Sequence, residues 1–382
     1  MAKVNKYVYL LGIVSFLTDV SSELIFSVFS IFFTVVLGAS TTLLGLVEGA
    51  SDFAASSLDY VSGYLSDKTG KRKRFAVLGY GFSTLAKILI LFNSVFFASL
   101  FRVIERLGKS FRGPPRDAWL SSFTTKSSRG LSFGIHKALD KSGAVVGPLI
   151  AYFALDSWGQ NAATFETLFI IALIPAVLSV LLLLFLNDKP TAPTKRENIF
   201  AAFKDTSIGF KHYLWTSAIF SLAYFSFSFL LLKAYLVGFE IKDVVLLYLL
   251  FNVAFVITAP IVGRIGDKIG RAKIVITEYA VYALMNIGFV FATTKMQVIG
   301  LFVLFGVFYA IDESQSKAYI TDLEKKRRAT AIGMYNFVNG VIYLPASLIA
   351  GFLWTFNPTY AFVFAGGISL LALLFFVTTK HL

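Results

Sequence analysis

Two carboxylates, Asp19 and Glu23, stand four residues apart near the middle of a long apolar stretch at the beginning of the chain. Residues four apart lie on one face of an α-helix. An ionisable side chain at membrane depth is costly and therefore marks a functional position by default. Two neighbouring carboxylates in a low-dielectric site cannot both ionise cheaply, so either one could carry a proton. The alternative is that both acids pair with basic residues of the fourth apolar span in a structural ion network.

The fourth apolar span is unusual because ionisable residues recur along it at three- and four-residue steps. They are Arg102, Glu105, Arg106, Lys109, Arg112 and Arg116. In lipid such a stripe must face a cavity or opposing acids. We expect Arg102, Arg106 and Lys109 to tune the proton-carrying acids or to bind an anionic group of a substrate, because arginine offers forked hydrogen bonding. Two consecutive prolines, Pro114 and Pro115, predict a kink in this span.

The other apolar spans contain fewer polar residues. Asp52 and Asp312 are further candidates for proton coupling, and Lys233, Asn336 and Asn339 are candidates for contact with a substrate. No spacing of ligand residues points to a metal site, and we expect neither a metal nor a cofactor.

The composition requires lipid as part of the solvent. The chain of 382 residues is 57% hydrophobic and 15% charged, and its mean hydropathy of +0.73 is too high for a soluble domain. The absence of cysteine excludes disulfides and thiolate metal sites. The sequence contains no metalloprotease motif and no Gly-x-Ser-x-Gly elbow, so we do not expect an enzyme.

Twelve stretches match the length of about 20 apolar residues that a membrane-spanning helix needs. They lie near residues 7–37, 41–64, 75–93, 95–123, 130–155, 165–187, 212–238, 243–265, 273–293, 296–322, 330–356 and 359–379. We therefore predict an all-α integral membrane protein that crosses the cell (plasma) membrane twelve times.

The formal net charge of +13 comes from basic residues that gather in short loops on alternate sides of the spans. Loops after spans two, four and ten are basic, whereas the turns after spans one, three and five contain no Lys or Arg. The positive-inside rule then predicts that both termini are cytoplasmic. Since no soluble basic domain is present, we expect no nucleic-acid partner. We expect a monomer whose partners are the bilayer, protons and a small-molecule substrate.

The basic loop between spans two and three recurs between spans eight and nine. At a constant offset of 200, the matching residues are Gly63, Asp67 and Gly70 in the first loop and Gly263, Asp267 and Gly270 in the second. A repeat that keeps register over half of the chain indicates two halves of similar plan. We place these halves at residues 1–187 and 212–382, joined by a cytoplasmic linker at 188–211 that includes an interfacial helix.

The repeated loop resembles the signature loop of the major facilitator superfamily of secondary transporters. Its residues are Gly63, Asp67, Lys68, Gly70 and Arg72, and then Gly263, Asp267, Lys268, Gly270 and Arg271. The resemblance implies two pseudo-symmetric halves of six helices that work by alternating access. It also implies a gating role for Asp67 and Asp267. The alternative is that the loops only anchor the topology.

Span five is similar to a motif associated with drug:proton antiporters, on the residues Gly134, Gly143, Gly147 and Pro148. Close helix packing alone would also favour these glycines. Exporters of the superfamily often carry a basic residue in span four that is thought to exchange protons, and Arg102 is the positional match.

The resemblance implies a proton-coupled antiporter that exports a small organic solute or a drug. An organic-anion or organophosphate exchanger or symporter is the alternative among transporters. From a different class, the chain could be a membrane sensor or scaffold that kept the fold and lost transport. Such a protein should lose its intramembrane charges, whereas this chain keeps many.

Overall fold

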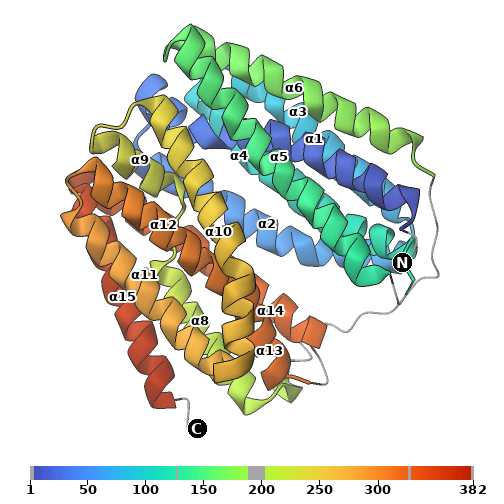
Figure 1. Cartoon of the computed structure of the whole chain (residues 1–382), viewed down its shortest axis with the longest axis vertical. Helices are drawn as coiled ribbons and strands as arrows, with labels where there is room; N and C mark the ends of the chain where they lie inside the picture. Colours follow the sequence, from blue (N-terminus) through green and yellow to red (C-terminus); the bar gives the residue numbers. More distant parts are fainter. Residues whose placement is uncertain (1–3, 126–127, 188–202, 326–327, 380–382) are drawn as a thin grey trace. The chain divides into compact units, whose positions relative to one another are not determined.

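The computed structural model of the protein describes residues 4–125, 128–187, 203–325 and 328–379, and in these ranges the chain forms helices and no strand. The helices up to residue 185 are α1 (Lys6–Ile31), α2 (Thr41–Thr69), α3 (Arg72–Leu89), α4 (Val95–Ser122), α5 (Arg129–Trp158) and α6 (Ala162–Phe185). Those that follow are α8 (Ile208–Ala223), α9 (Ser228–Leu236), α10 (Ile241–Ile269), α11 (Arg271–Phe291), α12 (Lys295–Ile311), α13 (Lys317–Leu323), α14 (Arg328–Phe356) and α15 (Pro358–Thr379). Figure 1 shows their arrangement.

The all-α membrane fold predicted from hydropathy is confirmed, because each predicted span coincides with helical structure. Within the described residues, ten helical stretches are long and apolar enough to cross a membrane. The helices α2 and α4 are not among these stretches, since several ionisable residues lie along each of them. In α4 the helix continues through Pro114 and Pro115.

Two predicted spans differ from a simple helix. The seventh is broken, because α8 ends at Ala223 and α9 begins at Ser228. The tenth contains a π-helical turn, η4 (Asp312–Ser316), between α12 and α13. A second π-helical turn, η1 (Phe32–Val36), follows α1, and the 3-10 turn η2 (Ile90–Phe92) follows α3.

Several helix ends are set by local hydrogen bonds and glycines. The Asn161 side chain caps the start of α6, and Thr294 forms a capping box with Gln297 at the start of α12. Gly70 and Gly270 adopt φ values of 69° and 91° at the turns that follow α2 and α10. Only glycine takes up this conformation without strain, which explains why both loops keep it.

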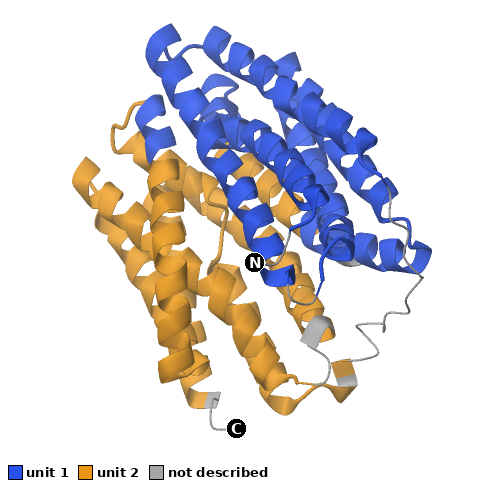
Figure 2. Cartoon of the chain, turned by 45° about the vertical axis from the view of Figure 1, so that its right-hand side comes forward, with its two compact units in different colours: residues 1–39, 54–196, 241–246 blue, residues 40–53, 197–240, 247–382 orange. Residues whose placement is uncertain are grey.

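The chain divides into two compact units, coloured separately in Figure 2. Unit 1 comprises residues 1–39, 54–196 and 241–246, and unit 2 comprises residues 40–53, 197–240 and 247–382. Two helices are therefore divided between the units, α2 after residue 53 and α10 after residue 246.

In unit 1, α1 packs against both α5 and α6, and α3 packs against α4. Its core includes Val14, Tyr80 and Trp119, each at most 1% exposed. In unit 2, α11 packs against α12 and α15, and α8 packs against α14 and α15. Aromatic rings fill its interior; the rings of Phe220 and Tyr279 stack with their centroids 4.3 Å apart.

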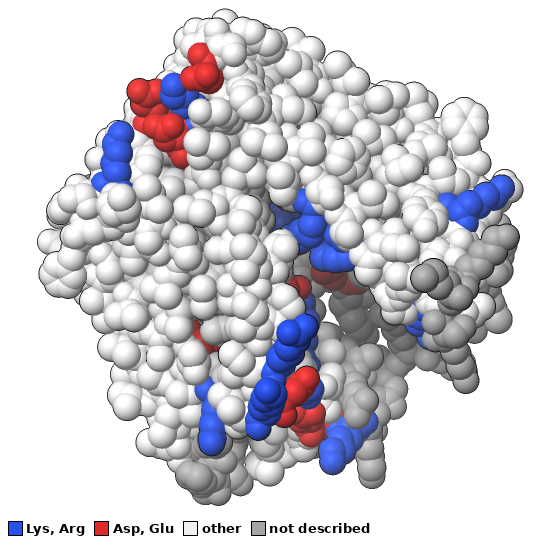
Figure 3. Space-filling view, in the orientation of Figure 1, with Lys and Arg blue, Asp and Glu red and all other residues white. Residues whose placement is uncertain are grey.

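The outer helices carry apolar side chains on their exposed faces. On α6, Ile170, Ile174 and Leu181 are each 46–59% exposed, while Phe169 and Ala176 on the other face are fully buried. An exposed apolar stripe of this length is stable in lipid and not in water. Figure 3 shows that most of the visible face carries neither acidic nor basic side chains.

The predicted linker at residues 188–211 lies largely outside the described residues. In its described part, Phe203–Asp205 forms the 3-10 turn η3 and α8 begins at Ile208. The division into halves at 1–187 and 212–382 stays a prediction, as does the cytoplasmic position of both termini.

Candidate functional site

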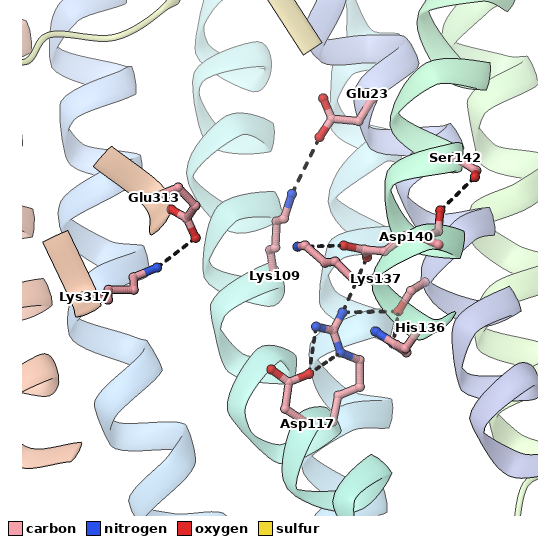
Figure 4. Close-up of polar contacts among 12 residues, drawn as sticks. Glu23, Lys109, Asp117, His136, Lys137, Asp140, Ser142, Glu313 and Lys317 are labelled. Carbon is pink, nitrogen blue, oxygen red and sulfur yellow. Dashed lines mark hydrogen bonds and ion pairs between the residues drawn. The ribbon is translucent and has the colours of Figure 1, made fainter. Parts of the chain in front are cut away.

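The two predicted proton carriers lie on the same face of α1. Glu23 pairs with Lys109 of α4 at 3.7 Å between Oε1 and Nζ (Figure 4). Asp19 is 7% exposed and packs against α5, where a Cβ on Gly143 would lie 3.1 Å from the Cβ of Asp19. Among the described residues Asp19 forms no ion pair or hydrogen bond, although Lys109 and Arg112 lie within its electrostatic reach. Lys109 therefore pairs directly with Glu23 and acts on Asp19 only from a distance. Asp19 has no direct partner among the described residues.

A second group of buried charges surrounds Glu105, which is 3% exposed. Its carboxylate lies 3.7 Å from Arg102 and accepts a hydrogen bond of 3.0 Å from the hydroxyl of Ser22 on α1. The same hydroxyl accepts a bond of 3.1 Å from Nζ of Lys87 on α3, which is completely buried. Three helices are therefore joined by one polar group. Lys87 was not selected from the sequence, where the only signal was a single lysine within an apolar span.

The other arginines of α4 are also engaged by neighbours in unit 1. Arg102 lies with its guanidinium carbon 4.5 Å from the ring centre of Phe26, a cation–π contact. Arg112 is 2% exposed and donates a hydrogen bond of 2.7 Å to the hydroxyl of Ser83 on α3. Arg106 is partly buried and interacts with its surroundings as well. The stripe predicted from the sequence is thus a polar seam between helices, buried at Arg102, Glu105 and Arg112.

A third group gathers around Arg116 (Figure 4). This guanidinium pairs with Asp117 at 2.9 Å and with Asp140 of α5 at 3.8 Å. It also donates a hydrogen bond of 3.2 Å to the hydroxyl of Ser15 on α1, which lies 3.0 Å from Nε2 of His136. The group links α1, α4 and α5 with titratable side chains.

The candidate residues of unit 2 are more dispersed. Asp312 opens the π-helical turn η4, Lys233 lies on α9, and Asn336 and Asn339 lie on α14. A serine hydroxyl of α8 donates a hydrogen bond of 2.8 Å to Oδ1 of Asn339, which is 3% exposed. Asp52 lies on the first part of α2 and is partly buried.

Two buried acids of unit 2 were not selected from the sequence. Glu48 of α2 is 1% exposed and accepts a hydrogen bond of 3.2 Å from the hydroxyl of Ser226, in the break between α8 and α9. Glu278 of α11 is 1% exposed and accepts a hydrogen bond of 2.9 Å from Ser316 of η4. Glu278 was an isolated acid in an apolar span, whereas Glu48 stands four residues before Asp52, and these were the available signals.

The first signature loop forms its contacts within unit 1. Asp67 lies 3.8 Å from Arg72, and Arg72 donates a hydrogen bond of 2.8 Å to the carbonyl of Ala118 on α4. The loop therefore ties the end of α2 and the start of α3 to the end of α4.

The second loop repeats this arrangement within unit 2. Arg271 lies 3.2 Å from Asp267 and donates a hydrogen bond of 3.3 Å to the carbonyl of Ala318 on α13. It also pairs with Asp322 at 2.7 Å. The remaining motif residues lie in the last turns of α2 and α10, namely Gly63, Lys68, Gly263 and Lys268. The gating role of both loops stays a prediction.

The glycines of the antiporter-like motif differ in their surroundings. A Cβ on Gly147 would lie 2.8 Å from the backbone nitrogen of Leu24, and Gly143 faces α1 in the same way. A Cβ on Gly134 would meet nothing within 4 Å. Pro148 follows within the continuous helix α5. Two of the three glycines thus allow α1 and α5 to pack closely.

The structure combines membrane-spanning helices, a loop that is repeated in the two units and held in each by an arginine, and buried ionisable groups. These features are typical of membrane transport proteins. The family model of the Major Facilitator Superfamily matches residues 11–294 and 237–381. The chain belongs to the major facilitator superfamily.

Sequence relatives support this membership over nearly the full length. An uncharacterised MFS-type transporter of Methanocaldococcus jannaschii is 35% identical over 378 residues, covering 97% of this chain and 94% of the relative. Multidrug resistance protein 2 of Bacillus subtilis is 25% identical over 360 residues, covering 89% and 87%.

Solved structures show the same fold at low sequence identity. The nucleoside transporter NupG superposes with a TM-score of 0.80 at 15% identity, covering 98% of this chain and 100% of that one. A POT family transporter in complex with 5-aminolevulinic acid gives a TM-score of 0.79 at 15% identity, covering 98% and 96%. These likenesses concern the fold and not the substrate.

Proposed function

We propose that the protein is a proton-coupled antiporter of the plasma membrane, which exports a small organic solute by alternating access. We propose no enzymatic activity for it. The observation that carries it is the pairing around Lys109: this lysine lies 3.7 Å from Glu23, while Asp19, one turn away on α1, has no direct partner among the described residues.

Such an arrangement suits proton exchange for a physical reason. A carboxylate held in a protein interior without an ion pair changes its charge more readily than one that is fully paired. Protonation of Asp19 would remove its negative charge. Lys109 would then be attracted by Glu23 alone and would pair with it more strongly. Loss of the proton would make both acids compete for the same cation. The charge state of α1 then alters how it is held against α4, which is the kind of bistable contact that a transport cycle requires.

The names of the relatives support the proposal that the solute is exported. One relative at 25% identity is named a multidrug resistance protein. The close packing of α1 on Gly143 and Gly147 of α5 is consistent with the antiporter-like motif on these residues.

An organic-anion or organophosphate exchanger is a second candidate, because α4 carries more basic than acidic residues. Arg106 is the residue to test. If the stripe binds substrate, Arg106→Ala should weaken transport of anionic solutes selectively, whereas an equal loss for every solute would assign Arg106 a structural role.

Proton flux through the purified protein in liposomes tests the proposal. A trapped pH dye reports the flux while lipophilic cations, and separately organic phosphates and carboxylates, are added; protein-free liposomes give the background. Proton flux that requires both protein and solute supports antiport. Flux evoked only by anions would favour the second candidate. Solute exchange without any proton flux would contradict proton coupling.

A further inference from the structure

Asp312 is the membrane-embedded acid of unit 2 whose surroundings are least explained by the fold. It is partly exposed and opens the π-helical turn η4. Among the described residues it forms no hydrogen bond or ion pair, since the nearby Lys317 pairs instead with Glu313 at 2.8 Å. A carboxylate at membrane depth is costly unless a partner or a ligand meets it.

The break in the seventh span lies beside this acid. Tyr224 occupies the break, and its ring centroid lies 5.2 Å from that of Tyr343 on α14 and 5.8 Å from that of Phe308 on α12. The hydroxyl of Tyr282 on α11 donates a hydrogen bond of 3.2 Å to the carbonyl of Ala223, which the end of α8 leaves without a helical partner. The break is thus an ordered feature with its own hydrogen bonds.

Two irregular backbone segments therefore lie near each other in unit 2, because the ring of Phe308, one turn before Asp312, lies 5.8 Å from that of Tyr224 in the break. Asp312 lies within electrostatic reach of Tyr224 and Tyr343. Tyr309, one turn before Asp312, lies within reach of Tyr224 as well. Irregular backbone at membrane depth is tolerated where it is buried in protein or lines a water-filled cavity, and π-helical turns often mark functional positions. Tyr224, Tyr309, Tyr343 and Asp312 are all partly exposed.

The charges around this group favour a cation. Besides Asp312, the acids Glu278 and Glu313 lie nearby, and Lys317 is the one basic residue that acts on Asp312 among the described groups. The surroundings of Asp19 in unit 1 are more mixed, because the basic residues Lys109 and Arg112 act on it there together with the acids Asp140 and Glu23. A positively charged solute would therefore meet fewer basic groups at Asp312 than at Asp19.

We propose that Asp312, Tyr224, Tyr309 and Tyr343 bind the ammonium group of an organic cation, which is the solute that this protein transports. The carboxylate neutralises the charge, and the faces of the tyrosine rings add cation–π attraction. The proposal rests on the proposed transport function and names the substrate class of that function. It assigns solute binding to unit 2 and proton exchange to unit 1.

Isothermal titration calorimetry on the full purified chain in detergent tests this assignment. The probes are phenyltrimethylammonium, neutral benzyl alcohol and anionic benzoate, which all carry one ring. We expect the ammonium probe to bind, and Asp312→Asn to weaken this binding about tenfold or more. The matched control is Asp322→Asn, because Asp322 is also an acid of unit 2 but lies outside this group, where it pairs with Arg271 at 2.7 Å. This control should bind the ammonium probe as the wild type does.

A second pair of variants keeps the test valid if Asp312→Asn does not fold. Tyr224→Phe keeps the ring face and should bind the ammonium probe almost normally, whereas Tyr224→Leu should weaken binding by about three- to tenfold. The proposal is overturned if benzoate binds as tightly as the ammonium probe. It is also overturned if the probe does not bind, or if neither Asp312→Asn nor Tyr224→Leu alters binding. Calorimetry requires no proton gradient, so a failure of proton coupling would be visible separately in the liposome assay.

Discussion

Lys109 of α4 places its Nζ 3.7 Å from Oε1 of Glu23 on α1 and thereby joins two helices of unit 1 by a charge pair. The lysine side chain is 37% exposed and that of the glutamate 14%. A pair with this much access can form and break within a transport cycle, unlike the fully buried Lys87.

Neutralising either acid of α1 should therefore uncouple transport from pH. We expect Asp19→Asn or Glu23→Gln to remove the pH dependence of solute transport, because the proton would lose its binding group. Transport into liposomes is measured at several external pH values. Glu166→Gln is the control, since Glu166 lies at the start of α6, where its carboxylate accepts a hydrogen bond from Asn93. If both α1 variants kept the wild-type pH dependence, neither residue would be the proton carrier.

Lys87→Met should destabilise the protein rather than change its coupling. The substitution removes the hydrogen bond to Ser22 and leaves the polar group around the buried Glu105 without this cation. We expect a loss of about 1–3 kcal/mol, seen as a lower midpoint of thermal unfolding in detergent. Lys325→Met changes the same side chain at an exposed position and should leave the midpoint unchanged. Equal midpoints for Lys87→Met and wild type would show that the buried lysine does not contribute to stability.

The two signature loops should differ in their sensitivity to loss of the acid. The side chain of Asp67 is 11% exposed, whereas that of Asp267 is 69% exposed and competes with Asp322 for Arg271. Asp67→Asn should slow the transport cycle while solute binding remains measurable, because it weakens a gate and not a binding site. Asp267→Asn should have the smaller effect. Equal loss of binding and transport in Asp67→Asn would contradict a gating role.

Helix packing at the antiporter-like motif can be tested with two alanines. Gly147→Ala adds a methyl group that would lie 2.8 Å from the backbone of Leu24, and overpacking of this kind costs about 1–3 kcal/mol. Gly134→Ala adds the same group where nothing lies within 4 Å. We expect only Gly147→Ala to lower the thermal midpoint and the yield of folded protein. Similar behaviour of the two variants would mean that α1 and α5 have room to adjust.

The sequence was sufficient to predict the spans and the repeated loops. Hydropathy averages over a whole helix, and a lipid-spanning helix must be apolar over a known length, so boundaries such as those of α3 and α11 could be located within a few residues. The loop repeat could be identified because Gly70 and Gly270 occupy turns that only glycine forms easily.

Because hydropathy is averaged over a whole span, it does not identify single buried charges. Lys87, Glu48 and Glu278 each stand within a predicted span, and their hydrogen bonds are formed with serines from distant parts of the chain. The break between α8 and α9 contains neither glycine nor proline, so no helix-breaking residue predicts it. Tertiary packing decides these features, and hydropathy and turn residues do not report it.

The division of α2 and α10 has a consequence for cutting the protein in two. Residues 40–53 pack within unit 2, where Gly49 faces the backbone of Leu344 on α14; residues 241–246 pack within unit 1, where Lys242 pairs with Asp156 at 2.7 Å. A cut in the linker would leave each fragment without a segment that its own compact unit requires. We therefore expect the fragments to be degraded when produced separately and to complement each other when a cell makes both.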